Sequence, residues 1–222
     1  MPFTLATVRQ TVKDRLDDDD ANDSVINKFI NDTQREIFNT YVLPFNQSTF
    51  SGTLTVGEHA FDLTATAASY QRIISLRLTD PDGSEKDLTE DFMEYREFRK
   101  NHPDPARNDN NIPSTWTTWA NKIYFSTPVD QEYTMDLDFI RSAVTLEDDE
   151  EVPELPEAFQ EILVLGALVR YFERNDDNDI AQYHKGKSGG YDDQITMLIN
   201  RYNPAQVGKT TTMKNSYRRG RR

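Results

Sequence analysis

The chain has 222 residues and a formal net charge of −13, and 36% of its residues are apolar. A chain of this size can bury one sizeable core, or one core and a second small one, so we expect one or two closely packed domains. It contains no cysteine, which excludes a disulfide framework, a thiolate nucleophile and a cysteine zinc cluster. Neither a signal peptide nor an apolar run of about eighteen residues is present, so we expect a soluble protein made inside a cell, with no membrane partner.

Two helices are predicted at the N-terminal end. The first is indicated by apolar residues that recur at helical spacing, namely Leu5, Val8, Val12 and Leu16. The second is expected to begin at a cap on Asp23 or Ser24 and to stop at Leu43-Pro44. Its buried stripe is predicted to comprise Ile26, Phe29, Ile30, Thr33, Ile37 and Tyr41.

From Phe45 onward the apolar period changes to two, which is typical of strands with one buried face. The predicted inward positions of three strands are Leu54 and Val56, then Phe61 and Leu63, then Ile74, Leu76 and Leu78. An amphipathic helix over 90–102, a hairpin over 114–128 and a strand that buries Tyr133, Met135, Leu137 and Phe139 should follow. Residues 46–147 are therefore predicted to form a compact β-sandwich-like unit.

The C-terminal third is predicted to be helical again. Residues 147–161 include eight acids and no base, which indicates a solvated connector leading into a helix N-terminus. The following segment, 156–175, is apolar on nearly all sides and should be buried by the N-terminal helices and by a last helix that ends at Asn203-Pro204. That last helix should bury Tyr191, Ile195, Leu198 and Ile199.

Two segments resemble catalytic motifs, but both lack the context that the chemistry requires. Gly186, Ser188 and Gly190 have the spacing of a nucleophile elbow, yet no strand is predicted before Ser188 and no histidine follows it. The segment 208–210 (Gly-Lys-Thr) resembles the end of a phosphate-binding loop, but asparagine occupies position 203, where that loop needs glycine. We expect no catalytic residue and no cofactor.

Metal and sugar sites are also disfavoured. The acidic clusters 17–20 and 176–179 lack the central glycine and the spacing of a calcium loop, so solvated loops are the better interpretation. The three histidines, His59, His102 and His184, lie far apart in the sequence, and we expect no metal site. Trp116 and Trp119 are three residues apart in a strand and should lie on opposite faces, which disfavours a shared sugar-binding platform.

Positive charge is concentrated at the C-terminal end. The last fourteen residues contain no acid and six basic side chains, Lys209, Lys214, Arg218, Arg219, Arg221 and Arg222. Without them the chain carries 19 basic and 38 acidic residues, a net charge of −19. Because so acidic a body should repel nucleic acid, the tail is the segment expected to bind an anionic partner, either a protein groove or DNA.

The chain resembles the head-to-tail connector (adaptor) proteins of tailed bacteriophages. The resemblance is carried by four segments in order, 25–45, 59–78, 112–139 and 152–184, and covers most of residues 20–200. It implies an α+β fold, in which an antiparallel helical bundle over 1–45 and 148–203 carries an inserted β-sandwich-like domain over 46–147. Residues 204–222 would form an extended basic tail.

The same resemblance implies a non-enzymatic virion protein at the head-tail junction. Such proteins form a homo-oligomeric ring, commonly a dodecamer, between the portal protein and a nozzle or tube protein of the tail, and double-stranded DNA passes through the lumen without specific binding. The C-terminal arm would bind the portal through Lys209, Lys214, Tyr217, Arg218, Arg219, Arg221 and Arg222. A DNA-binding protein that acts through this tail is the alternative. The family pattern also implies a continuous helix where Gly186, Gly189 and Gly190 interrupt this chain.

Overall fold

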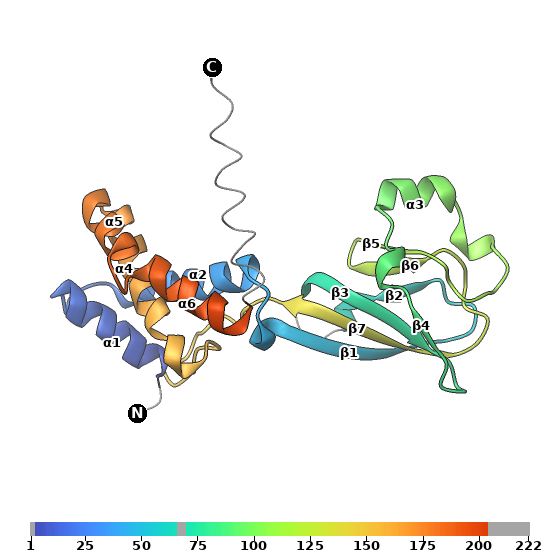
Figure 1. The fold of residues 1–222 in the computed structure, drawn as a ribbon, viewed down its shortest axis with the longest axis horizontal. Coiled ribbons are helices and arrows are strands. Elements are labelled where there is room, and N and C mark those ends of the chain that lie inside the picture. Colours follow the sequence, from blue (N-terminus) through green and yellow to red (C-terminus); the bar gives the residue numbers. More distant parts are fainter. Residues whose placement is uncertain (1–2, 66–69, 204–222) are drawn as a thin grey trace, which may run out of the picture. The chain divides into compact units, whose positions relative to one another are not determined.

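The computed structural model describes residues 3–65 and 70–203 (Figure 1). The chain divides into a helical unit, residues 1–46 and 142–222, and a β unit, Gln47–Arg141. The β unit is one uninterrupted insertion between two helical segments. The chain contains both helices and antiparallel sheets, which confirms the predicted α+β class.

The first two helices of the helical unit begin at polar caps. Helix α1 (Leu5–Leu16) follows Thr4, whose side chain accepts a hydrogen bond from the Thr7 backbone N–H. Helix α2 (Asp23–Thr40) follows Asn22, whose side-chain oxygen accepts from the Val25 N–H at 3.3 Å. The predicted cap on Asp23 or Ser24 is therefore wrong, because asparagine caps a helix as well as aspartate does and precedes both residues.

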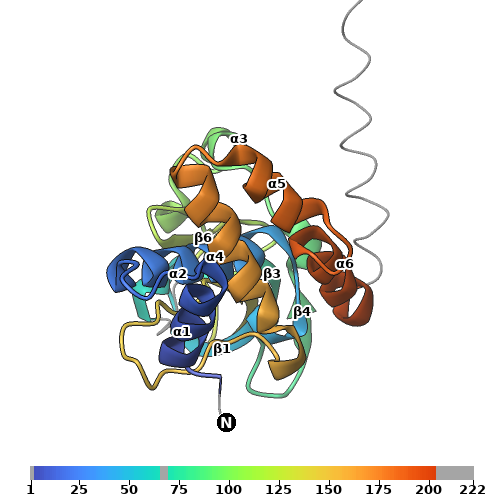
Figure 2. The ribbon, with the colours of Figure 1, turned by 90° about the vertical axis from the view of Figure 1, so that its left-hand side faces the viewer.

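The remaining helices of this unit are α4 (Glu161–Arg174), α5 (Asn178–Gly186) and α6 (Tyr191–Tyr202). Helix α4 contacts α1 and α2 as well as α5 and α6 (Figure 2), which explains why its sequence is apolar on nearly every side. The glycine-rich segment separates α5 from α6, so the continuous helix implied by the family pattern is absent here. At Gly189 the backbone takes a φ of +72°, a conformation that glycine adopts without strain.

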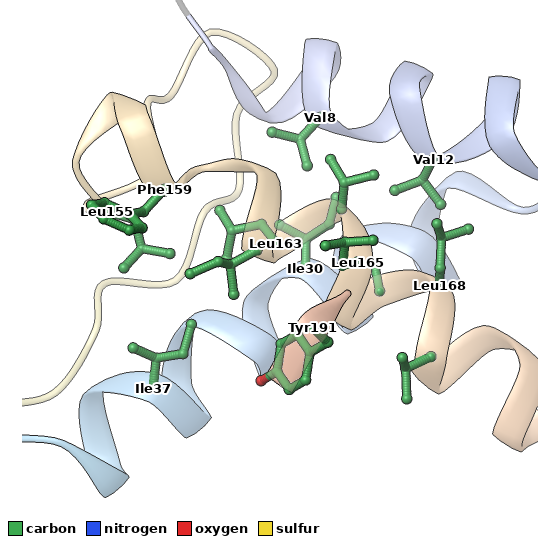
Figure 3. Close-up of a cluster of buried hydrophobic side chains, with 14 of the residues drawn as sticks. Val8, Val12, Ile30, Ile37, Leu155, Phe159, Leu163, Leu165, Leu168 and Tyr191 are labelled. Atoms are coloured by element: carbon green, nitrogen blue, oxygen red, sulfur yellow. The ribbon is translucent and has the colours of Figure 1, made fainter. Parts of the chain in front are cut away.

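The core of the helical unit is formed by the apolar faces of these helices (Figure 3). The stripe of α1 contributes Leu5, Val8 and Val12, and α2 contributes Ile26, Ile30 and Ile37, as predicted. Gly166 of α4 lies against Thr33 of α2, and a Cβ at Gly166 would lie 2.4 Å from the Thr33 Cγ2 atom. The absence of a side chain at Gly166 therefore allows α2 and α4 to pack closely at this point.

The β unit contains two antiparallel sheets. One has the strand order β1 (Gln47–Leu54), β7 (Tyr133–Arg141), β3 (Tyr70–Thr79) and β4 (Glu85–Asp87). The other has the order β2 (Ala60–Asp62), β6 (Lys122–Phe125) and β5 (Trp116–Trp119), and helix α3 (Tyr95–Asn101) precedes β5. One hydrophobic cluster joins the sheets and includes Leu54, Leu76, Leu78, Ile123, Phe125, Met135 and Leu137.

Three sequence predictions in the β unit are wrong in detail. The register between β3 and β7 shifts between Ile73 and Ser75, so Ile73 faces the core and Ile74 is 39% exposed. Such a bulge reverses the face that a strict period of two assigns to a residue. Val56 and Leu63 lie outside the strands, and Val56 is 59% exposed although Leu63 is buried as predicted. The helix predicted over 90–102 is limited to α3.

The hairpin between β5 and β6 contains a strained residue. Ala120 and Asn121 form its two-residue turn with φ values of 49° and 60°, the left-handed conformation of a type I′ turn. Alanine is a poor residue for this conformation, whereas asparagine adopts it readily.

We expect Ala120→Asn to raise the free energy of unfolding by about 0.5–1 kcal/mol, because strain of this kind costs a non-glycine residue about 1–2 kcal/mol. Ala120→Val should lower it, because a β-branched residue fits a positive φ least well. Urea denaturation of the two variants measures both effects, and equal midpoints would contradict the assignment of strain to this turn.

Candidate interaction surfaces

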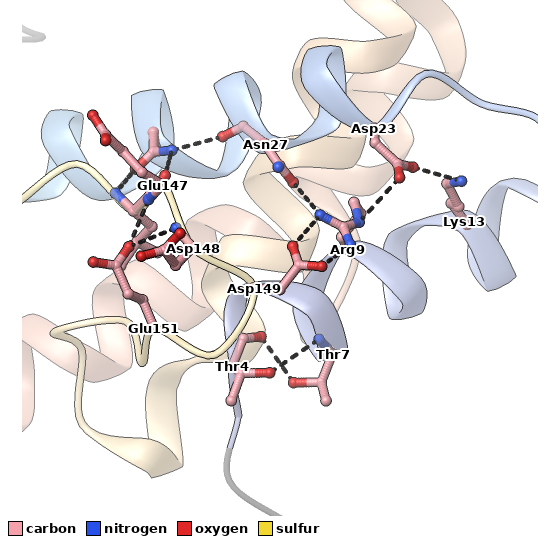
Figure 4. A network of polar contacts seen from close by, with 12 residues as sticks. Thr4, Thr7, Arg9, Lys13, Asp23, Asn27, Glu147, Asp148, Asp149 and Glu151 are labelled. Atoms are coloured by element: carbon pink, nitrogen blue, oxygen red, sulfur yellow. Dashed lines mark hydrogen bonds and ion pairs between the residues drawn. The ribbon is translucent and has the colours of Figure 1, made fainter.

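The acidic connector between β7 and α4 is anchored to α1 by charge and by backbone (Figure 4). The two terminal nitrogens of the Arg9 guanidinium, Nη1 and Nη2, donate to the Asp149 carboxylate at 2.8 and 3.1 Å. The Nε atom of Arg9 lies 3.6 Å from the Asp23 carboxylate. The Leu5 and Ala6 N–H groups donate to the carbonyls of Glu151 and Asp149 at 2.8 and 3.1 Å. The prediction of a solvated connector therefore holds for most of its acidic side chains but not for its backbone.

Two amide side chains of α2 bind backbone groups of the connector and of the residues just before it. Asn31 donates to the Leu146 carbonyl at 3.0 Å and accepts from the Leu146 N–H at 2.7 Å. One turn later, Gln34 donates to the Val144 carbonyl and accepts from the Glu154 N–H, both at 3.0 Å. The two amides thus provide hydrogen-bond partners for backbone N–H and carbonyl groups, which a neighbouring β-strand would otherwise provide.

The Arg9 contact should make stability depend on pH. The hydrogen bond from Arg9 is the largest cause that holds the pKa of Asp149 below its ordinary 3.8. A carboxylate with a lowered folded-state pKa contributes stability above its unfolded-state pKa and loses it as the pH falls through the folded-state value.

Asp149→Asn should therefore reduce stability at pH 7, and the deficit relative to wild type should shrink as the pH falls through the folded-state pKa of Asp149, which lies below its ordinary 3.8. Asp148→Asn is the matched control, because it removes a neighbouring acid without changing the Arg9 contact. Urea midpoints between pH 7 and pH 2.5 test this, and a constant deficit across that range would contradict the assignment.

The β unit contains a pocket of about 400 Å³, here named the Trp116 pocket. Residues 70–74 of β3 line it, together with Thr89, Phe92, Trp116 and Thr118. The indole of Trp116 is buried and donates to the Leu88 carbonyl at 2.6 Å, so the pocket floor is held in place. The bulge in β3 exposes Ile74 at the pocket, which is also lined by Phe92, a side chain that is 52% exposed.

The two tryptophans lie apart, as predicted. Trp116 is 4% exposed and Trp119 is 55% exposed. The Trp119 ring stacks on Tyr95 of α3 with centroids 4.3 Å apart, so this contact fixes its orientation. A shared platform for sugar stacking is not formed.

The outer face of the four-stranded sheet is polar and hydrogen-bonded. Asp138 of β7 accepts from Thr49 of β1 at 2.6 Å and from Ser75 of β3 at 2.5 Å. Hydrogen bonds from Ser75 and then Thr49 are the main causes that lower the pKa of Asp138. Asp138 therefore stays charged, but its two oxygens already have partners.

The catalytic and metal motifs of the sequence have no supporting geometry in the described residues. Ser188 follows helix α5 rather than a strand, which excludes a nucleophile elbow. His184 stacks on Phe172 at 5.5 Å, and burial is the main cause that lowers its pKa. Within residues 3–65 and 70–203, no group of three metal-ligating side chains is found.

No helix in the described part of the chain has the length and apolar content needed to cross a membrane.

The predicted portal-binding residues lie outside the described residues, as does the 208–210 motif. They comprise Lys209, Lys214, Tyr217, Arg218, Arg219, Arg221 and Arg222.

Comparisons with known proteins identify the class. The model of a family described as the SU10 adaptor protein matches residues 3–208, which defines the class as a structural adaptor. The chain belongs to the SU10 adaptor protein family, and the predicted resemblance to phage head-to-tail connectors is thereby confirmed.

Among solved structures, the chain is similar to one described as "Neck of empty GTA particle computed with C6 symmetry". The identity is 15% and the TM-score 0.25, over 80% of this chain and 79% of that chain. A comparison with curated proteins finds no match.

Proposed function

We propose that the chain forms a ring at the head-tail junction of a virion, where it joins the portal to the nozzle or tube of the tail. The observation that carries the proposal is the family match over residues 3–208, which spans both the helical unit and the β unit. DNA passes through the lumen of the ring during ejection. The acidic body suits a channel wall, because negative charge repels the phosphate backbone and keeps DNA from adhering.

We further propose that the basic arm, residues 209–222, binds an acidic groove on the portal. The arm follows the last residue matched by the family model and carries six positive charges next to a body of net charge −19. An acidic body needs no basic tail for solubility, which favours a role in binding. The arm would form charge-assisted hydrogen bonds, with Tyr217 as its aromatic contact.

DNA binding by the arm is the second candidate function, and its charge pattern is the observation that favours it. If all six cations paired with duplex phosphates, the logarithm of the binding constant would fall with the logarithm of salt concentration with a slope of about −5. Such binding depends on charge and hardly on residue order.

A peptide of residues 208–222 and a scrambled peptide of identical composition separate the two candidates. Portal binding requires that the native peptide bind portal rings more tightly than the scrambled peptide does. Equal binding of both peptides to duplex DNA, with the steep salt slope and no preference on portals, would support the second candidate instead. Fluorescence anisotropy over 50–300 mM salt measures both.

A further inference from the structure

We infer that the Trp116 pocket receives the Val56 turn, residues 55–58, of a second copy of this chain. The inference rests on the proposed ring and supplies one of its contacts. A ring needs two different, complementary patches on each copy, because its interfaces are head-to-tail.

The Val56 turn is held in one conformation and exposes an apolar side chain. The Glu58 N–H donates to the Thr55 carbonyl at 3.0 Å, and the Glu58 carboxylate accepts from the Thr55 N–H at 2.7 Å. Gly57 takes a φ of +86° and donates to the Val129 carbonyl at 2.9 Å, so the turn is also held from its side. Val56 at its tip is 59% exposed and contributes nothing to the core of its own unit. A fixed turn with an exposed apolar tip can enter a pocket at little entropic cost.

The pocket provides the complementary surface. Its apolar lining includes Ile73, Ile74, Phe92 and Trp116. Its volume of about 400 Å³ leaves room for a protruding side chain together with part of the turn that carries it. Exposed Phe92 and Ile74 are large apolar groups that a second copy would remove from water.

The turn and the pocket of one copy cannot meet. Leu54, which precedes the turn, pairs with Tyr133 at the start of β7, whereas Ile73 of the pocket pairs with Phe139 near its end. These positions are six residue steps apart along β7, about 20 Å of strand. The end of β1 and the start of β3 accordingly lie at opposite ends of the sheet (Figure 1).

Charge favours the same pairing. The end of the sheet that carries the turn is formed by segments 55–58, 80–85 and 128–132, which contain six acids and no base. These acids are Glu58, Asp80, Asp82, Glu85, Asp130 and Glu132. Among the described residues that line the pocket, Arg72 alone is charged, and it is exposed. Insertion of Val56 therefore brings an acidic surface to Arg72.

An open chain of copies joined by this contact has one unused turn at one end and one unused pocket at the other. Copies can therefore add until the last turn meets the first pocket, and the portal ring provides a template that favours closure over an open filament.

Engineered cysteines test the contact directly, because the chain has none of its own. The variant Val56→Cys with Ile74→Cys is oxidised on portal rings and at high concentration without them, and is then separated on a denaturing gel without reductant. A disulfide needs Cα atoms within about 7 Å, so these positions cannot be linked within one copy. We expect a ladder of multimers whose highest rung reports the subunit number. Each single-cysteine variant should give dimers at most.

The possible outcomes separate the inference from the proposed function. If wild type assembles on portals and the oxidised double-cysteine variant assembles equally but yields no ladder beyond dimer, the contact is wrong and the adaptor function stands. If wild type never binds portals, the proposed function fails, whereas a ladder at high concentration would still support the contact.

A charge exchange provides a second test that does not depend on oxidation. Glu132→Arg, which leaves the Glu58–Thr55 hydrogen bond of the turn in place, and Arg72→Glu should each reduce assembly at least tenfold, and a chain with both substitutions should assemble better than either single variant. An occupant other than a second copy would leave the double variant no better than the worse single variant.

Discussion

Replacing Gly166 by alanine should lower the free energy of unfolding by about 1–3 kcal/mol, the usual cost of overpacking a core. The added Cβ would lie 2.4 Å from Cγ2 and 2.7 Å from Oγ1 of Thr33, and 3.0 Å from the Tyr191 ring. Thr33 cannot rotate away freely, because its hydroxyl donates to the Phe29 carbonyl and accepts from Arg170, both at 2.8 Å. The higher helix propensity of alanine, worth at most about 1 kcal/mol, offsets only part of this cost.

Three further variants separate the clash from the general effect of replacing glycine in a helix. Gly186→Ala in α5 meets no atom within 4 Å and should leave stability nearly unchanged. Thr33→Ser removes Cγ2, so the Gly166→Ala/Thr33→Ser pair should lose less than the sum of the single losses. Urea denaturation measures all four chains. A Gly166→Ala chain as stable as wild type would contradict the close packing of α2 on α4.

Replacing Asn31 by alanine should cost about 2–4 kcal/mol, because it leaves the buried N–H and carbonyl of Leu146 without their partner, at about 1–3 kcal/mol each. Asn31 is 8% exposed, so water reaches the vacated groups poorly. The loss should be local as well as global. The Leu146 amide proton, which donates to Asn31 at 2.7 Å, should exchange with solvent much faster in the variant.

Asn27→Ala is the matched control for Asn31. Asn27 lies one turn earlier on α2, and its side chain makes a longer contact of 3.4 Å with Arg9. We expect it to change stability by less than about 0.5 kcal/mol. Hydrogen exchange and urea denaturation of both variants test the role of Asn31. Unchanged protection of Leu146 would show that another group holds the segment before the connector.

The sequence predicts those parts of the fold that depend on a regular apolar period. The stripe of α1, the buried sides of α4 and the alternation of β7 follow from side-chain spacing alone, since burial of one face repeats every turn or every second residue. The buried faces that meet across the helical unit, with Ile30 and Leu163 among them, were thus recognisable before their contacts were known.

Features set by long-range contacts were not predictable in this way. The β3 bulge that exposes Ile74 depends on pairing with β7, and the binding of Leu146 by Asn31 joins residues 115 positions apart. The Trp116 pocket also lacks a local signal, because its lining comes from β3, β5 and the segment around Phe92. Val56 carried one signal in its sequence, since it precedes a glycine that favours a tight turn.

A binding role of the arm is inferred from its charge composition and not from a folded structure. Six cations without an acid indicate an anionic partner, but several kinds of acidic surface satisfy that pattern equally well. The family match explains the body of the chain and stops at residue 208, just before the first of these cations.

The most direct test of the adaptor function is the mass of the purified protein, alone and mixed with its portal ring, measured by light scattering for the full chain and for a chain truncated after Val207. The account predicts that the full chain adds a defined number of copies to each portal and that the truncated chain adds few or none. Failure of the full chain to associate with the portal would contradict the adaptor function, and equal association of both chains would contradict the role of the arm.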